Sequence, residues 1–222
     1  LGDYPAESLY ETIPQFHDTA KRFRDFEDAQ RKDVKNRARQ CREEIEFVLS
    51  RKDDCDVLMK QLEEGKLPLR VTHNDTKLNN ILFDKDTDEG LCIIDLDTIM
   101  PGLAANDFGD SIRFGASTAE EDEKDLDKVH FDISLYDIYV KGYLEMAKDV
   151  LTPAEIESLP WGARLMTLEC GMRFLADFLQ GDVYFKTAYL EHNLVRARTQ
   201  FRLVKEMEEQ FDEMNAILKK YV

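Results

Sequence analysis

A short polar run in the middle of the chain has the composition of a reaction site. Positions 73–80 read HNDTKLNN, so His73, Asp75, Lys77 and Asn80 lie within eight residues. Asp95 follows Asp75 by 20 positions, at the end of the apolar run CII. A carboxylate can accept a proton from an alcohol, and amide and carboxylate oxygens are hard ligands suited to Mg²⁺. With a lysine to neutralise charge, these are the groups that phosphoryl transfer requires.

The residues around this run predict a small β-structure that brings its two halves together. Residues 69–71 are a short strand candidate that leads into the polar run. Two β-rich segments, 81–84 and 91–96, are separated by the turn-forming stretch DKDTDEG and are expected to form a hairpin. A hairpin returns Asp95 to the side of Asn80, so that both can hold one metal ion while Asp75 stays free to accept a proton.

The remaining sequence predicts helices. Apolar residues recur three or four positions apart within 14–50, in a highly charged background. A helical start is expected near Asp107, after a loop from 98. Further helices are expected over residues 56–64, 134–148, 153–159, 161–179 and 187–221. The fold class is therefore α+β and mainly α, with the central hairpin carrying the polar loops.

Composition excludes several classes of function. The formal net charge of −16 over 222 residues argues against binding to nucleic acid or to anionic lipid. No apolar run approaches the ~18 residues that span a membrane, and residues 1–30 do not have the pattern of a signal peptide. The four cysteines show no CxxC spacing, so neither a zinc ribbon nor a disulfide framework is indicated. A cytoplasmic protein is expected.

Three blocks of the sequence resemble the aminoglycoside phosphotransferase-like kinases, which are a protein-kinase-like superfamily. They read HNDTKLNNILFD, IIDLDTIMPG and DFGDSIRFGAST. Two flanking blocks, ETIPQFHDTAKRF and RFLADFLQGDVYFK, are similar to sugar kinases of the N-acetylhexosamine 1-kinase type. The resemblance covers nearly the whole chain in dispersed blocks. It implies Mg²⁺-dependent transfer of the γ-phosphoryl group of ATP to a hydroxyl of a small molecule, most simply the anomeric hydroxyl of a sugar.

The resemblance implies a role for each residue of the polar run. Asp75 matches the catalytic base, which orients the acceptor hydroxyl. Asn80 and Asp95 match the residues that hold the metal ion. Lys77 matches a phosphate-contacting lysine, and His73 is expected to support the loop by hydrogen bonds.

Three further acidic residues have both a functional and a structural interpretation. Asp97 either assists the metal ion or orders its loop. Asp107 and Asp110 precede a predicted helix, so N-capping or an ion pair with Arg113 is the favoured interpretation. The resemblance implies that an acid near this point steadies the catalytic loop.

Arg173 and Tyr184 match positions that contact sugar in the N-acetylhexosamine kinase subgroup. Forked donors suit sugar oxygens, and an aromatic face suits the C–H surface of a sugar. The structural alternatives are an ion pair of Arg173 with Asp177 at i+4 and a core position for Tyr184. The remaining histidines show no ligand spacing and are interpreted as surface or core residues: His17, His130 and His192.

Some parts of a kinase are missing from this sequence. It has no G-x-G-x-x-G loop and no V-A-I-K-like strand before the polar run. Residues 1–222 are therefore expected to form only the C-terminal, catalytic and substrate lobe of a kinase-like fold. A nucleotide-binding N-terminal lobe would lie outside this chain, and an exposed apolar patch would mark where it docks.

Other functions remain open at this point. The acceptor can be another small alcohol, as in aminoglycoside, choline or homoserine kinases. Arg173 and Tyr184 facing the Asp75 carboxylate would favour a sugar, whereas an acidic pocket or an aromatic cage would favour such cations. A non-catalytic interaction module on a kinase scaffold is a second alternative. A metal-dependent phosphatase would need a second set of ligands, and the spacing supplies none.

Overall fold

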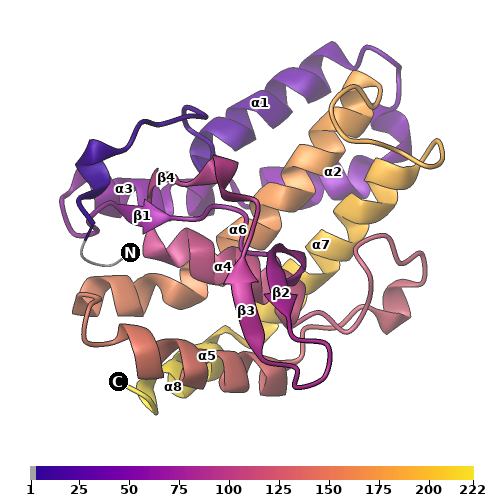
Figure 1. Ribbon diagram of the computed structural model, residues 1–222. Helices are drawn as coiled ribbons and strands as arrows, with labels where there is room; N and C mark the ends of the chain where they lie inside the picture. The colour runs from indigo at the N-terminus through magenta and orange to yellow at the C-terminus, as the bar shows by residue number, and fades with distance from the viewer. Residues whose placement is uncertain (1–3) are drawn as a thin grey trace.

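The computed structural model describes residues 4–222 and confirms the α+β, mainly helical class (Figure 1). Eight α-helices, six short 3₁₀ turns and four short strands are present in this part of the chain. The helices are α1 (Thr19–Lys32), α2 (Arg42–Leu49), α3 (Val57–Glu63), α4 (Ala104–Gly115), α5 (Ile133–Ala147), α6 (Pro153–Gln180), α7 (His192–Glu209) and α8 (Phe211–Lys219). The strands are β1 (Arg70–Thr72), β2 (Ile81–Phe83), β3 (Gly90–Ile93) and β4 (Met100–Gly102).

Helix α6 is the central element, and α1, α4 and α7 pack around it. It begins with a capping box: the Thr152 hydroxyl accepts the Glu155 N–H, and the Glu155 carboxylate accepts the Thr152 N–H. It ends at Gly181, whose φ of +98° suits a residue without Cβ. The expected break between 159 and 161 is wrong, because α6 continues through Pro160. Burial on nearly all sides outweighs the roughly 3 kcal/mol cost of an internal proline.

Helices α4 and α6 approach each other at glycines. A Cβ on Gly109 would overlap the Gly162 carbonyl, and a Cβ on Gly162 would overlap the Ala105 carbonyl. The side chains around this crossing form one of two buried clusters, which includes Phe108, Ile112, Leu159 and Ala163. The close crossing fixes α4 relative to α6, and both helices carry residues of the candidate site.

Two expected helices are divided in the structure. The segment 14–50 forms α1 and α2, because α1 ends at Asp33, which adopts φ +33°. The Asp33 carboxylate then accepts the backbone N–H groups of Arg37 and Ala38 and closes a turn. Residues 187–221 form α7 and α8, and α7 begins only at His192. Hydrogen bonds within the turns end helices at such places, and the spacing of apolar residues in the sequence gives no sign of them.

The strands form two separate two-stranded antiparallel sheets. Strand β1 pairs with β4, with Thr72 opposite Met100. Strands β2 and β3 form the predicted hairpin, with Ile81 opposite Ile93. The hairpin and the turns beside it expose seven large apolar side chains: Leu78, Leu82, Phe83, Leu91, Ile93, Ile94 and Leu96.

The described part of the chain has no helix with the length and the apolar composition needed to cross a bilayer. Its four cysteines are free thiols.

Candidate active site

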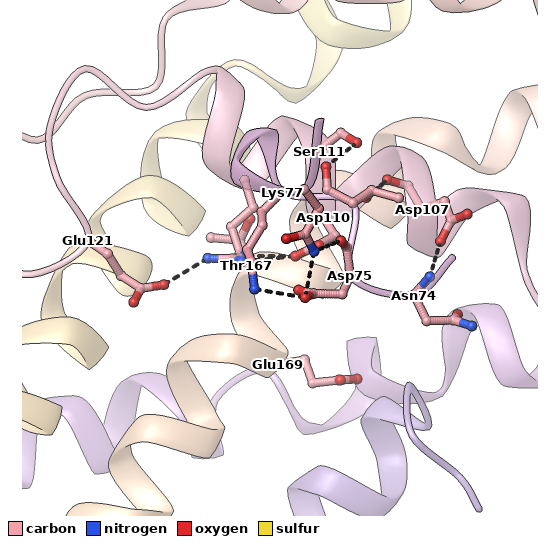
Figure 2. A network of polar contacts seen from close by, with 12 residues as sticks. Asn74, Asp75, Lys77, Asp107, Asp110, Ser111, Glu121, Thr167 and Glu169 are labelled. Carbon is pink, nitrogen blue, oxygen red and sulfur yellow. Dashed lines mark hydrogen bonds and ion pairs between the residues drawn. The ribbon is translucent and has the colours of Figure 1, made fainter. Parts of the chain in front are cut away.

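The polar run follows β1 and forms a loop that ends in β2. Asp75 is its centre, because one carboxylate oxygen, Oδ2, accepts hydrogen bonds from Lys77 Nζ at 2.7 Å and from Asn80 Nδ2 at 2.8 Å. Figure 2 shows Asp75 and Lys77 pointing toward each other. Burial raises the pKa of Asp75, but the hydrogen bonds from Lys77 and Asn80 outweigh it and lower the pKa. Asp75 is therefore ionised at neutral pH, as a proton acceptor must be.

Asp95 reaches the same place through the hairpin. The backbone N–H of Ile94 donates to the Asn80 carbonyl at 2.9 Å, which sets Asp95 beside Asn80. His73 supports this junction, because its Nε2 donates to the Ile94 carbonyl at 3.0 Å. Asp95 itself is a left-handed residue with φ +63°. The hairpin therefore places the backbone of Asp95 beside Asn80, as the sequence predicted.

The acidic groups at the end of β3 repel one another, and a cation could relieve this repulsion. A hydrogen bond with Asp97 and its negative charge raise the pKa of Asp95, and the charge of Asp75 adds to this effect. Asn80 uses its amide nitrogen on Asp75, so its Oδ1 is the atom available to a cation. Residues 4–222 contain no cluster of three or more His, Cys, Asp and Glu side chains able to hold a metal. Mg²⁺ needs only one or two carboxylates, because waters and phosphates complete its shell.

Helix α4 holds the polar loop from behind. The Asp107 carboxylate accepts the backbone N–H of His73 at 2.8 Å and of Asn74 at 2.7 Å (Figure 2). The Thr76 hydroxyl donates to the Asp107 carbonyl at 2.6 Å. The N-capping interpretation is wrong for Asp107, because α4 begins at Ala104 and Asp107 already lies in its first turn. Asp107 instead anchors the loop that carries Asp75.

Asp110 has a different structural task. It forms the predicted ion pair with Arg113, with Nη2 to Oδ1 at 2.9 Å. Arg113 is buried and also pairs with Glu121 at 3.0 Å. The pair therefore ties α4 to the acidic segment that follows it.

His17 is a residue of the site that the sequence did not reveal. Its ring bridges the Glu169 carboxylate at Nδ1 and the Asn74 carbonyl at Nε2, both at 2.9 Å. The Asn74 carbonyl accepts, and so does the Glu169 carboxylate when it is ionised, so the arrangement suits an imidazolium with hydrogen on both ring nitrogens. Burial lowers the pKa of His17, but the charge of Glu169 together with the hydrogen bonds to Glu169 and Asn74 outweighs burial and raises the pKa. Glu169 lies 152 residues away, so no local pattern could have found this pair.

Arg173 and Tyr184 meet in a hollow of about 430 Å³ between α1, α6 and the loop after α6. The guanidinium of Arg173 lies 5.4 Å from the Phe16 ring centroid, 5.8 Å from Tyr184 and 5.5 Å from Phe185. Tyr184 is 71% exposed, so the core interpretation is wrong. The i+4 ion pair with Asp177 is also absent from residues 4–222.

This hollow is separate from the polar loop, and Asp75 does not line it. The two are nevertheless neighbours, because Phe16 of the hollow precedes His17, which contacts Asn74. On α6, Arg173 follows Glu169 by four residues, about 6 Å along the helix axis. Arg173 and Tyr184 therefore share one hollow, but they do not face the Asp75 carboxylate as the preference for a sugar would require.

A family model described as the phosphotransferase enzyme family matches residues 5–147. The match includes the polar loop, the hairpin with Asp95 and helix α4. The chain belongs to this family. Membership supports a kinase-like phosphotransferase that acts on a small molecule. Arg173 and Tyr184 lie outside the matched residues, so the family match does not identify the acceptor.

Proposed function

We propose that this chain is the catalytic and substrate lobe of a kinase that transfers the γ-phosphoryl group of ATP to a sugar hydroxyl, as an N-acetylhexosamine 1-kinase does. The observation that carries the proposal is the cluster of Asp75, Lys77 and Asn80 beside Asp95. In this cluster Asp75 accepts the proton of the acceptor hydroxyl. Asn80 and Asp95 hold Mg²⁺, with Asp97 beside them. When bound, Mg²⁺ would neutralise the charge of the nucleotide phosphates.

Lys77 and Asp107 prepare Asp75 for this reaction. Lys77 pairs with Asp75 before substrate arrives, which keeps the base ionised. When a nucleotide is bound, the ammonium group of Lys77 would neutralise charge on the transferred phosphoryl group. Asp107 holds the backbone on the N-terminal side of Asp75, so the base is positioned by a rigid helix rather than by the loop itself.

The chemistry of the hollow favours a neutral, oxygen-rich acceptor. Its aromatic rings already surround the guanidinium of Arg173, which has no ion-pair partner among residues 4–222. A cationic aminoglycoside or choline would be repelled there. Two of the acids at the rim, Asp25 and Asp28, are paired with their own helix neighbours, Lys21 and Arg31. Sugar oxygens can accept hydrogen bonds from the fork of Arg173, while a ring of the hollow covers a sugar face.

The exposed apolar side chains of the β2–β3 hairpin support the proposal that another domain packs on this hairpin. Leu91 and Ile93 are 63% and 60% exposed, and they lie next to the candidate metal site. We propose that a nucleotide-binding N-terminal lobe packs on this surface in the full-length protein. Residues 1–222 alone should then bind Mg-ATP weakly in calorimetry, and micromolar affinity would contradict the proposal.

The function is tested with full-length enzyme, a panel of sugars and amino alcohols, and ADP release as the readout. N-acetylhexosamines are expected to be the best acceptors. Asp75→Asn should lower kcat by about 10²–10⁴-fold, with nucleotide affinity unchanged, because the base acts on the acceptor. Asp137→Asn is the control, since Asp137 also has a lysine partner but lies on α5. Normal kcat in Asp75→Asn, or a preference for cationic alcohols, would overturn the assignment.

A further inference from the structure

The loop after α6 carries Tyr184, and among residues 183–185 only Phe185 packs against the core, on Phe174. Val183 and Tyr184 are 74% and 71% exposed. The loop begins with two left-handed residues, Gly181 at φ +98° and Asp182 at φ +61°. An exposed segment of this kind keeps one conformation only if polar contacts hold its backbone.

Asp177 supplies these contacts from the last turn of α6. It is 2% exposed, and its Oδ1 accepts the backbone N–H of Val183 at 2.9 Å and of Tyr184 at 2.8 Å. Its Oδ2 accepts the N–H of Phe185 at 2.9 Å. Three consecutive N–H groups thus converge on one carboxylate, an arrangement in which each hydrogen bond is charge-assisted.

A second buried residue locks this anchor to α7. Asn193 is fully buried, and its Nδ2 donates to Asp177 Oδ2 at 2.9 Å and to Asp182 Oδ1 at 3.0 Å. Asp182 in turn pairs with Arg37 at 2.5 Å. The loop is therefore tied to α6, to α7 and to the turn between α1 and α2.

Asp177 lines the hollow, but all four of these donors come from the protein. We propose that Asp177 is a positioning residue for the acceptor: it does not bind the sugar but holds Tyr184 and Phe185 against Arg173. Because the guanidinium of Arg173 lies between these rings, movement of the loop would also displace the forked donors. The inference rests on the proposed function in one respect, namely that the acceptor occupies this hollow.

The test compares two variants of the full-length enzyme. Asp177→Asn replaces one accepting oxygen with an NH₂ group that faces backbone N–H donors. Hydrogen exchange at amides 183–185 should accelerate by about tenfold or more, and the acceptor KM should rise by about tenfold, the effect of losing one charge-assisted hydrogen bond. The kcat and the nucleotide KM should stay within about twofold, because Asp75 and the metal ligands lie on another loop.

Glu206→Gln is the matched control. Glu206 is also a buried carboxylate that accepts a backbone N–H, that of Phe131 at 2.7 Å, but it lies on α7 away from the hollow. It should accelerate exchange at Phe131 and leave the acceptor KM unchanged. If Asp177→Asn does not fold, Asn193→Ala removes a single donor and should give smaller changes in the same direction.

Each outcome separates the positioning role from the proposed function. Unchanged exchange at 183–185 would show that Asp177 is not the anchor. Faster exchange with an acceptor KM no different from that of Glu206→Gln would overturn the positioning role. The acceptor used is the best one in the panel. If the wild-type enzyme prefers cationic alcohols, the sugar proposal is refuted, but the effect of Asp177→Asn on the KM for that acceptor still decides the role of Asp177.

Discussion

The buried pair of His17 and Glu169 should contribute far more to stability than an exposed pair of the same geometry. His17 bridges the Glu169 carboxylate and the Asn74 carbonyl at 2.9 Å each. His130 bridges the Glu206 carboxylate at 3.0 Å and another backbone carbonyl at 2.9 Å. The exposed fraction is 8% for the His17 side chain and 48% for that of His130. Comparing the two pairs therefore isolates the effect of burial on the stability that such a pair contributes.

The size of the stability loss follows from the buried groups that His17→Gln leaves without their hydrogen-bond partner. Glu169 is completely buried, and without His17 its closest remaining hydrogen-bond donor is the Thr19 hydroxyl at 2.9 Å. Removing one member of a buried charged pair typically costs about 3–5 kcal/mol. We expect about 3 kcal/mol, because glutamine can still donate to one of the two partners. For a chain of this size such a loss lowers Tm by about 6–12 °C.

The stability that the His17–Glu169 pair contributes changes with pH in a defined direction. The folded-state pKa of His17 is raised above 6.5, so its contribution is complete below pH 6.5 and is lost as pH rises through the folded value. Burial raises the pKa of Glu169, but His17, Arg173 and Arg22 outweigh it and hold that pKa below 4.5. The contribution of Glu169 is therefore present above pH 4.5 and is lost as pH falls through its folded value. The negative charge of Asp110 also faces His17 and favours the imidazolium.

Thermal unfolding followed by circular dichroism between pH 5 and 9 measures this contribution. The Tm difference between wild type and His17→Gln should be largest between pH 5 and 6.5 and should shrink at higher pH. His130→Gln should change Tm much less at every pH. The reasoning is refuted if the two variants lose similar stability, or if the difference for His17→Gln does not depend on pH.

Three other perturbations have clear expected outcomes. Gly109→Ala should destabilise the protein by at least about 2 kcal/mol, because its Cβ would meet the Gly162 carbonyl. Gly142→Ala, at an exposed position of α5 with open space around it, should instead stabilise the protein by about 0.5–1 kcal/mol; thermal unfolding measures both. Asp107→Asn should lower kcat about tenfold or more in steady-state assays, with nucleotide affinity retained, because the loop with the base loses a charge-assisted anchor. Asp95→Ala should abolish the Mg²⁺-dependent part of nucleotide binding by the full-length enzyme, and calorimetry with and without Mg²⁺ would show it.

The parts of the site that sequence could predict are those with short-range partners. Asn80 lies five residues after Asp75, and the hairpin that returns Asp95 is closed by a short acidic turn. Turn chemistry and alternation of apolar residues therefore fix this half of the site. The contacts of His17 could not be found, because the Glu169 carboxylate and the Asn74 carbonyl are brought to it only by the packing of α1 on α6.

The helix boundaries show the same division between local and tertiary causes. The left-handed conformation of Asp33 ends α1, although apolar residues continue at helical spacing beyond it. Pro160 has the opposite outcome, because α6 continues through a residue that normally interrupts a helix. In both places periodicity describes which face is buried but does not determine where the backbone turns.

The two loops assigned to the proposed site are held by the same kind of contact, a helix carboxylate that accepts backbone N–H groups. Asp107 on α4 accepts two consecutive backbone N–H groups of the loop that carries Asp75, and Asp177 on α6 accepts three from the loop that carries Tyr184. In each case a rigid helix supplies the charge and a short loop supplies the donors, so functional side chains can remain accessible without losing their position. Because α4 and α6 cross closely at Gly109, the two anchors belong to one rigid unit. The distance between the proposed base and the proposed acceptor hollow is thus set by helix packing rather than by either loop.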